Sequence, residues 1–175
     1  LAGGAVPGTP EGVEVRKVDL VGDDREGLGD QLGDDLKSHF EDAEAVVHLA
    51  ASAPVTPVAA THDVEVARRV LDAAAGAGVP HVVLLSSATV YGAWGNNPVP
   101  LTEEATLRPN PGVAYAAERA EIERLAAEWR DGHPGSTVTV LRPVRTAAAG
   151  VADWLVSAVR PGPAVPESAD DPPVQ

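Results

Sequence analysis

Two short segments of the sequence hold side chains that together could move a proton. Ser86 and Ser87 follow the apolar run His81–Leu85, which is typical of a buried strand. Tyr115 opens a helical pattern, and Arg119 comes four residues later, on the same helix face. A tyrosine can exchange a proton with a substrate oxygen, a nearby cation favours the phenolate, and a serine can hydrogen-bond the reacting oxygen. The pattern predicts general acid–base chemistry assembled from a strand end and a helix.

The elements that must position these residues alternate along the chain between strands and helices. Apolar or alternating runs predict strands over residues 13–18, 45–50, 82–86 and 137–141. Apolar residues at helical spacing predict helices over 64–74, 115–130 and 151–159, the first of them ended by Gly76 and Gly78. Strands that alternate with crossover helices predict an α/β fold with a parallel sheet.

The composition limits how the core is built and which chemistry it can hold. The 175 residues are enough for one domain with a sizeable core. They are 44% hydrophobic but only 3% aromatic, so Ala, Val and Leu must form that core. Cysteine is absent, which excludes disulfides, cysteine-based metal sites and a thiol nucleophile.

The charge of the chain bears on its partners. The net charge of −13 argues against nucleic acid or an anionic membrane as a partner. Many acids lie between Asp19 and Glu44, where a solvated acidic face is favoured over a metal site, and the five histidines have no ligand spacing. No apolar run approaches the ~20 residues of a membrane span. Because no signal-peptide pattern is present either, we expect a cytoplasmic protein. The absent cysteines and the scattered histidines lead us to expect no bound metal.

Several spaced motifs, in the right order between Val13 and Pro143, resemble the extended short-chain dehydrogenase/reductase family. This family comprises NAD(P)-dependent sugar epimerases, dehydratases and their relatives. The motifs are residues 45–51, 84–92 and 100–104, Pro109, Tyr115, Glu123 and residues 141–143. The resemblance implies a Rossmann-like doubly wound parallel sheet, NAD or NADP as cofactor, and an epimerase or oxidoreductase. Its substrate would be a sugar nucleotide or a small carbonyl or alcohol compound. A homodimer is left open.

The resemblance also implies roles for individual residues. Tyr115 would be the general acid/base, Ser87 would orient the reacting oxygen, and Arg119 would supply positive charge and hydrogen-bond the nicotinamide ribose. Thr89 would join Ser87 and Tyr115 on the substrate. The implied cofactor contacts are Asp19, Leu20, Ala50, Ala51, Ser86, Tyr115, Arg119 and Pro143. Dehydratases of the family carry an acidic pair just after the strand-end hydroxyl, whereas this chain has Ala88 and Thr89, which disfavours dehydration.

The chain departs from the family in three places. Arg119 stands where the family's Tyr-x-x-x-Lys motif has lysine, and residues 61–63 (Thr-His-Asp) stand where the family has an asparagine opening a helix. The glycine-rich dinucleotide fingerprint is absent, because no glycine follows an apolar strand at the required spacing. The early glycines are interpreted as turn residues: Gly3, Gly4, Gly27, Gly29 and Gly33.

The missing fingerprint bears on domain organisation. We expect residues 1–160 to be a partial NAD(P)-binding domain and residues 161–175 to be the irregular, Pro-rich start of a C-terminal substrate lobe. On this interpretation the chain is a fragment that lacks the family's first two strands, its first helix and most of that lobe. Such a chain is expected not to bind NAD(H) or NADP(H) measurably, because backbone N–H groups at a helix N-terminus hold the pyrophosphate.

Each site residue also has a structural interpretation. Tyr115 could be a core aromatic at a helix start, Ser87 could cap a turn, and Arg119 could pair with Glu123 at i+4. Asp19 could be a strand-end residue without contact to the cofactor. The sequence therefore leaves open a non-catalytic NAD(P)-binding or regulatory protein on the same scaffold, and a truncated, inactive paralogue.

Overall fold

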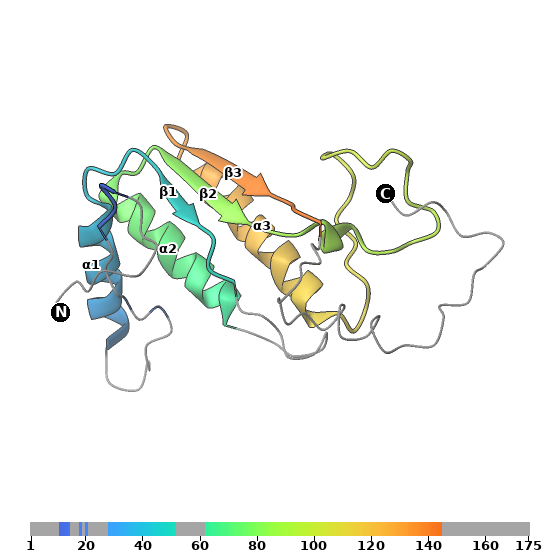
Figure 1. Ribbon diagram of the computed structural model, residues 1–175, viewed down its shortest axis with the longest axis horizontal. Coiled ribbons are helices and arrows are strands. Elements are labelled where there is room, and N and C mark those ends of the chain that lie inside the picture. Colours follow the sequence, from blue (N-terminus) through green and yellow to red (C-terminus); the bar gives the residue numbers. More distant parts are fainter. Residues whose placement is uncertain (1–10, 15–17, 19, 21–27, 52–61, 145–175) are drawn as a thin grey trace.

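The computed structural model describes residues 11–14, 18, 20, 28–51 and 62–144 (Figure 1). The predicted helix over 151–159, the domain boundary at residue 160 and Asp19 lie outside these residues. What is described is an α/β arrangement of strands and helices in alternation, in the order α1, β1, α2, β2, η2, α3 and β3.

The strands form a parallel sheet, as predicted. β1 (Val46–His48), β2 (His81–Leu85) and β3 (Thr137–Leu141) lie side by side in that order, and β2 is the central strand. Val82 of β2 lies opposite both Val46 and Val138, which fixes the register on its two sides. All carboxyl ends therefore lie at one edge of the sheet, where ligands bind in open α/β folds.

The strand predicted over 13–18 is not formed in its described residues. Val13, Glu14 and Val18 lie outside any strand, and Val13 is exposed. The alternating pattern is present, but a strand also needs a neighbour to complete its hydrogen bonds, and β1 pairs only with β2 in the described part of the chain.

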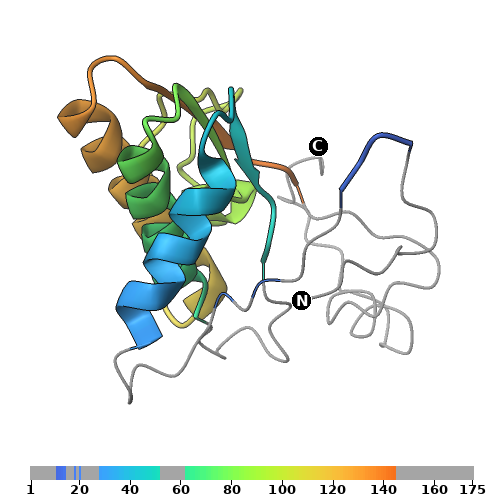
Figure 2. The same ribbon diagram turned by 90° about the vertical axis from the view of Figure 1, so that its left-hand side faces the viewer.

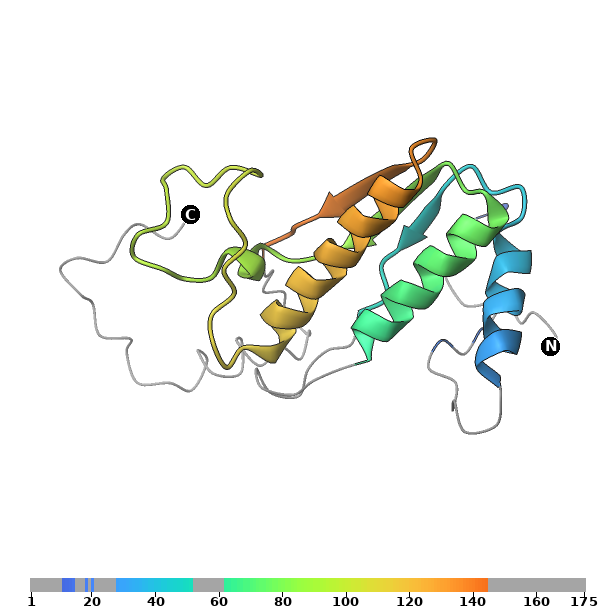
Figure 3. The same ribbon diagram turned by 180° about the vertical axis from the view of Figure 1, so that it is seen from behind.

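Helices cover one face of the sheet. α2 (Asp63–Ala77) and α3 (Ala114–Gly132) pack on that face, and α1 (Leu28–Phe40) packs along α2 (Figures 2 and 3). The core between them is built of small aliphatic residues and one tryptophan: Val46, Ala67, Val70, Leu71, Ala74, Val79, Val82, Leu84, Ile122, Leu125, Ala126 and Trp129. This confirms a core made mainly of Ala, Val and Leu.

Gly78 ends α2 in the left-handed conformation, with φ of 70°. Its backbone N–H donates to the carbonyl groups of Ala74 and Ala75, which is the usual use of glycine at this position. The second predicted stop, Gly76, lies inside the helix instead, beside the side chain of Lys37 from α1. A side chain here would press on Lys37, so the absence of a Cβ lets the two helices approach closely.

Helix α1 was not predicted, and the interpretation of Gly29 and Gly33 as turn residues is wrong, because both lie within it. The helical signal is the four-residue spacing of Leu28, Leu32, Leu36 and Phe40. Leu36 is buried, whereas Asp34 and Asp35 are exposed. The segment is therefore an acidic, solvated helix face, in line with the interpretation of its charges, but it is a helix and not a loop.

The opposite face of the sheet carries no helix from the described residues. Val47, Leu49 and Leu141 are exposed there or at its rim. None of the described helices is long and apolar enough to cross a membrane.

Candidate active site

Ser87 lies directly after β2, at the carboxyl edge of the sheet. Its backbone is extended, and its side chain caps the short helix η2 (Ala88–Tyr91). The Thr89 backbone N–H and the Thr89 hydroxyl donate to the Ser87 Oγ, at 3.2 and 3.0 Å. Ser87 therefore caps a turn, as its structural interpretation predicts. Since its oxygen accepts in both of these bonds, its own hydroxyl proton is left to donate.

Tyr115 and Arg119 occupy successive turns of α3. The Arg119 guanidinium carbon lies 5.0 Å from the centroid of the Tyr115 ring. Arg119 is 1% exposed, whereas Tyr115 is half-buried. The Arg119 Nη1 donates to the backbone carbonyl of Leu85 at 3.3 Å, and Leu85 is the last residue of β2. The structure thus brings the first turns of α3 to the end of the strand that Ser87 follows.

Arg119 does not pair with Glu123, so the alternative of an i+4 ion pair on α3 does not hold. Its Nη2 instead donates to the carboxylate of Asp63, the first residue of α2. Asp63 is only 5% exposed, so both charges of this pair are buried. Sequence reasoning did not assign Asp63 to the site. The available signal was that an acidic residue and an arginine both stand where the family has other residues.

His48 is the last residue of β1 and is buried near the same pair. Its burial lowers the pKa of the imidazole below its usual value of 6.5. The positive charge of Arg119 lowers this pKa further, and the negative charge of Asp63 opposes the change. His48 is therefore neutral at neutral pH and senses both charges.

A second buried network lies one turn further along α3. The Ser86 hydroxyl donates to Glu123, and Arg142 donates to both carboxylate oxygens of Glu123. Arg142 also donates to the Tyr91 hydroxyl at 2.5 Å and to the Glu103 carbonyl at 2.9 Å. The bond to Glu123 is the main reason why the pKa of Arg142 is raised. Ser86 thus has a buried structural partner in Glu123.

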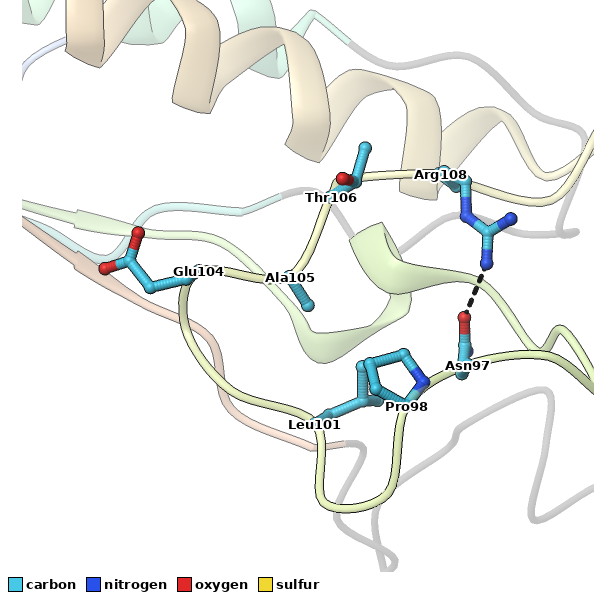
Figure 4. A pocket seen from close by; sticks show the side chains of 7 residues that line it. All are labelled: Asn97, Pro98, Leu101, Glu104, Ala105, Thr106 and Arg108. Atoms are coloured by element: carbon cyan, nitrogen blue, oxygen red, sulfur yellow. Dashed lines mark hydrogen bonds between the residues drawn. The ribbon is translucent and has the colours of Figure 1, made fainter.

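The long loop after η2 encloses a cavity of about 380 Å³ between Asn97 and Arg108. Arg108 donates to the Asn97 side chain at 2.9 Å across this loop (Figure 4). Gly92, with φ of 67°, begins the loop, and a Cβ there would collide with the Arg108 carbonyl and the Trp94 ring. Neither Ser87 nor Tyr115 lines this cavity, so it is separate from the predicted proton-transfer residues.

Comparison with protein families shows which family this chain belongs to. Residues 29–159 match the NAD dependent epimerase/dehydratase family. The chain belongs to this family. The matched residues include Ser87, Tyr115 and Arg119, together with their newly found partner Asp63.

Solved structures of family enzymes resemble the fold. A double mutant of DesIV, a dTDP-glucose 4,6-dehydratase from Streptomyces venezuelae solved with NAD and DAU bound, is 28% identical, with a TM-score of 0.55 over 63% of this chain and 34% of its own. A UDP-N-acetylglucosamine 4-epimerase from Methanobrevibacter ruminantium is also 28% identical, with a TM-score of 0.55 over 62% of this chain and 35% of its own. RMD from Pseudomonas aeruginosa, solved with NADPH, shows the fold alone, at 24% identity and a TM-score of 0.63 over 82% and 46%.

The chain therefore spans about a third of the length of the first two of these structures. A comparison with curated protein sequences gives no match.

Of the residues predicted to contact the cofactor, Tyr115 and Arg119 are described above and Asp19 lies outside the described residues; the others lie as follows. Ala50 and Ala51 follow β1, and Pro143 follows β3; all three are exposed at the carboxyl edge. The Leu20 carbonyl accepts from Arg69 at 3.1 Å. Ser86 is engaged by Glu123. These cofactor contacts stay predictions, and the described residues include no glycine-rich turn for the pyrophosphate.

Proposed function

We propose that this chain supplies the proton-transfer site of an NAD(P)-dependent epimerase or oxidoreductase. The substrate is a sugar nucleotide or a small carbonyl or alcohol compound. Family membership supports the reaction class, and the related structures include a UDP-N-acetylglucosamine 4-epimerase. The observation that carries the proposal is the position of Arg119, which contacts the Tyr115 ring and the end of β2, two residues before Ser87.

In this mechanism Tyr115 gives or takes the proton of a substrate hydroxyl or carbonyl oxygen. Ser87 donates its hydroxyl proton to the same oxygen, and Thr89 orients Ser87 through the two bonds that it donates. Arg119 contacts the Tyr115 ring and the end of β2, and so holds the tyrosine close to Ser87. The nicotinamide, when bound, accepts or returns a hydride. The hydrogen bond that the resemblance implies between Arg119 and the nicotinamide ribose stays a prediction.

The residues after Ser87 support epimerase or oxidoreductase chemistry over dehydration. Elimination of water needs an additional acid and base near the substrate. Ala88 has no functional group, and the Thr89 hydroxyl donates to Ser87. The place that carries an acidic pair in the resembled dehydratases therefore holds no carboxylate.

The test uses a longer protein that contains this chain, with a panel of nucleotide sugars and simple carbonyl compounds and with both nicotinamide cofactors. Hydride transfer is followed by nicotinamide absorbance, and epimerisation by product analysis. We expect turnover with at least one member of the panel and its loss in Ser87→Ala. Cofactor binding without turnover on any member would reject the proposal.

One observation favours a second candidate, a non-catalytic NAD(P)-binding or regulatory protein. Arg119 is buried and bound to Asp63 and Leu85, so its guanidinium is engaged inside the protein. A lysine is a compact point charge, whereas arginine is planar and stays charged, and the two are not equivalent. The same assay separates the candidates, because the regulatory protein would bind the cofactor in calorimetry and turn over nothing.

A further inference from the structure

The two side-chain departures from the resembled family meet in space. Arg119 replaces the lysine, and Asp63 lies in the segment that replaces the asparagine. They are 56 residues apart in the sequence, on α3 and α2, yet the Arg119 guanidinium donates to the Asp63 carboxylate. An uncharged and a cationic residue are thus replaced by a pair of opposite charges. The replacement of the lysine and the replacement of the asparagine therefore act together as one buried ion pair.

Burial makes the pairing necessary. Arg119 is among the largest fully buried side chains of the described residues. A buried guanidinium without a counter-charge is strongly destabilising. Asp63 gives that counter-charge from the first turn of α2, where a carboxylate is also favoured by the helix dipole. Of the two acidic residues in this turn, Asp63 is buried and Glu65 is exposed, so Asp63 is the one that faces inward.

The pair also limits where the guanidinium can lie. Arg119 contacts three different elements: Asp63 on α2, the Leu85 carbonyl on β2 and the Tyr115 ring on its own helix. Its Nε is buried and has no hydrogen-bond partner among the described residues. Two nitrogens therefore hold the group in place, and the Asp63 contact is the charged one. Without it, the guanidinium would be expected to leave its place beside Tyr115.

We propose that Asp63 is a positioning residue for Tyr115, acting through Arg119. Asp63 neutralises the buried guanidinium and holds it beside the Tyr115 ring at the end of β2. This assignment concerns the same site as the proposed function, and its catalytic consequence rests on that function. The structural part can be tested without any turnover.

The first experiment is a double-mutant cycle on the longer protein, measured by chemical unfolding. Asp63→Asn should raise the equilibrium constant for unfolding roughly 10²–10³-fold, because it leaves Arg119 buried and unpaired. Combining it with Arg119→Met should cost roughly 10-fold less than the two single effects multiplied together. The matched control is the exposed pair Glu121 and Arg124 on the same helix, 2.6 Å apart, with Glu121→Gln and Arg124→Met. Its effects should multiply without coupling.

The second experiment tests whether Asp63 fixes the position of the Tyr115 ring. The ring resonances of Tyr115 and Tyr91 can be assigned by NMR from the signals lost in Tyr115→Phe and in Tyr91→Phe. Asp63→Asn should shift the Tyr115 resonances and leave those of Tyr91 in place. It should also lower the pKa of His48 further, since Asp63 raises it in the unmodified protein. In an active enzyme, kcat should fall on the order of 10²-fold, with little change in KM. Adding Arg119→Lys to Asp63→Asn should restore part of that loss.

The outcomes separate the two proposals. Coupling in the buried pair together with a shift of Tyr115 supports the positioning role, even if no substrate is found. If Asp63→Asn fails to fold, folding of the double variant with Arg119→Met supports it as well. Multiplicative effects, failure of both variants to fold, or unmoved Tyr115 resonances would overturn it. Absence of turnover in the unmodified protein would reject only the proposed function.

Discussion

Two groups of identical chemical make-up lie near the carboxyl edge of the sheet, each a carboxylate, an arginine and a tyrosine. We call them the site triad, Asp63–Arg119–Tyr115, and the scaffold triad, Glu123–Arg142–Tyr91. In both, the guanidinium carbon lies close to the tyrosine ring, 5.0 Å from its centroid in the site triad and 5.2 Å in the scaffold triad. In both, the carboxylate is buried.

The triads differ in which member reaches the surface. In the site triad the arginine is 1% exposed and the tyrosine is half-buried, whereas in the scaffold triad the tyrosine is 8% exposed and the arginine side chain 23%. Arg142 donates to the Tyr91 hydroxyl, which fixes that hydroxyl inside the protein. Residue types alone therefore do not mark a site. Since only an accessible hydroxyl can meet a substrate, the half-buried Tyr115 is a better candidate than the buried Tyr91.

The largest difference between the triads should appear in catalysis. Tyr115→Phe in the longer protein should lower kcat roughly 10²–10⁴-fold, since it removes the proton-transfer group, and should leave cofactor affinity nearly unchanged. Tyr91→Phe removes the same atom from the scaffold triad and should leave kcat within a few-fold. Steady-state kinetics of the two variants side by side make the comparison. Equal losses would mean that the triads do not differ in function.

The scaffold triad should matter for stability as well. Arg142→Met leaves the Glu123 carboxylate buried without its ion-pair partner, which should cost about 3 kcal/mol of unfolding free energy. The control Arg124→Met removes an exposed arginine from ion pairs on the surface of α3 and should leave the unfolding free energy nearly unchanged. Denaturant titration measures both. A similar small effect in both variants would show that the Glu123 network is dispensable.

The turn that follows Tyr91 should be sensitive to a single methyl group. Gly92→Ala places a Cβ against the Arg108 carbonyl and the Trp94 ring at a positive φ, and should destabilise the protein by about 1–3 kcal/mol. Gly95→Ala, three residues later, has open space and is the matched control. Thermal unfolding of the two variants measures the difference in stability. Equal melting temperatures would show that the loop adapts without cost.

The smallest effect should come from pH. Because the pKa of His48 is lowered in the folded protein, the unfolded chain takes up a proton first as the pH falls. The free energy of unfolding should therefore decrease as the pH drops below 6.5 and stop changing from this source below the folded-state pKa. Unfolding titrations at several pH values should show this slope, and His48→Gln should remove it. An unchanged slope in His48→Gln would assign the dependence to other groups.

Local patterns predicted the elements around the site, because each depends on neighbours in sequence. The strand ending before Ser87 and the helix starting near Tyr115 lie within one or two residues of their predicted bounds. The partner of Arg119 could not be predicted, because Glu123 was available at i+4 and Asp63 is brought in only by the packing of α2 on α3. Helix α1 was missed since acidic residues and glycines masked its four-residue leucine spacing.

The measurement that tests the central claim most directly is an experimental structure of the longer protein with a nicotinamide cofactor and a bound substrate or product. The account predicts that the Ser87 and Tyr115 hydroxyls both lie within hydrogen-bond distance, roughly 2.6–3.2 Å, of one substrate oxygen. It also predicts that Arg119 stays paired with Asp63 beneath them. Hydroxyls that face different cavities, or a substrate oxygen bound by neither of them, would contradict it.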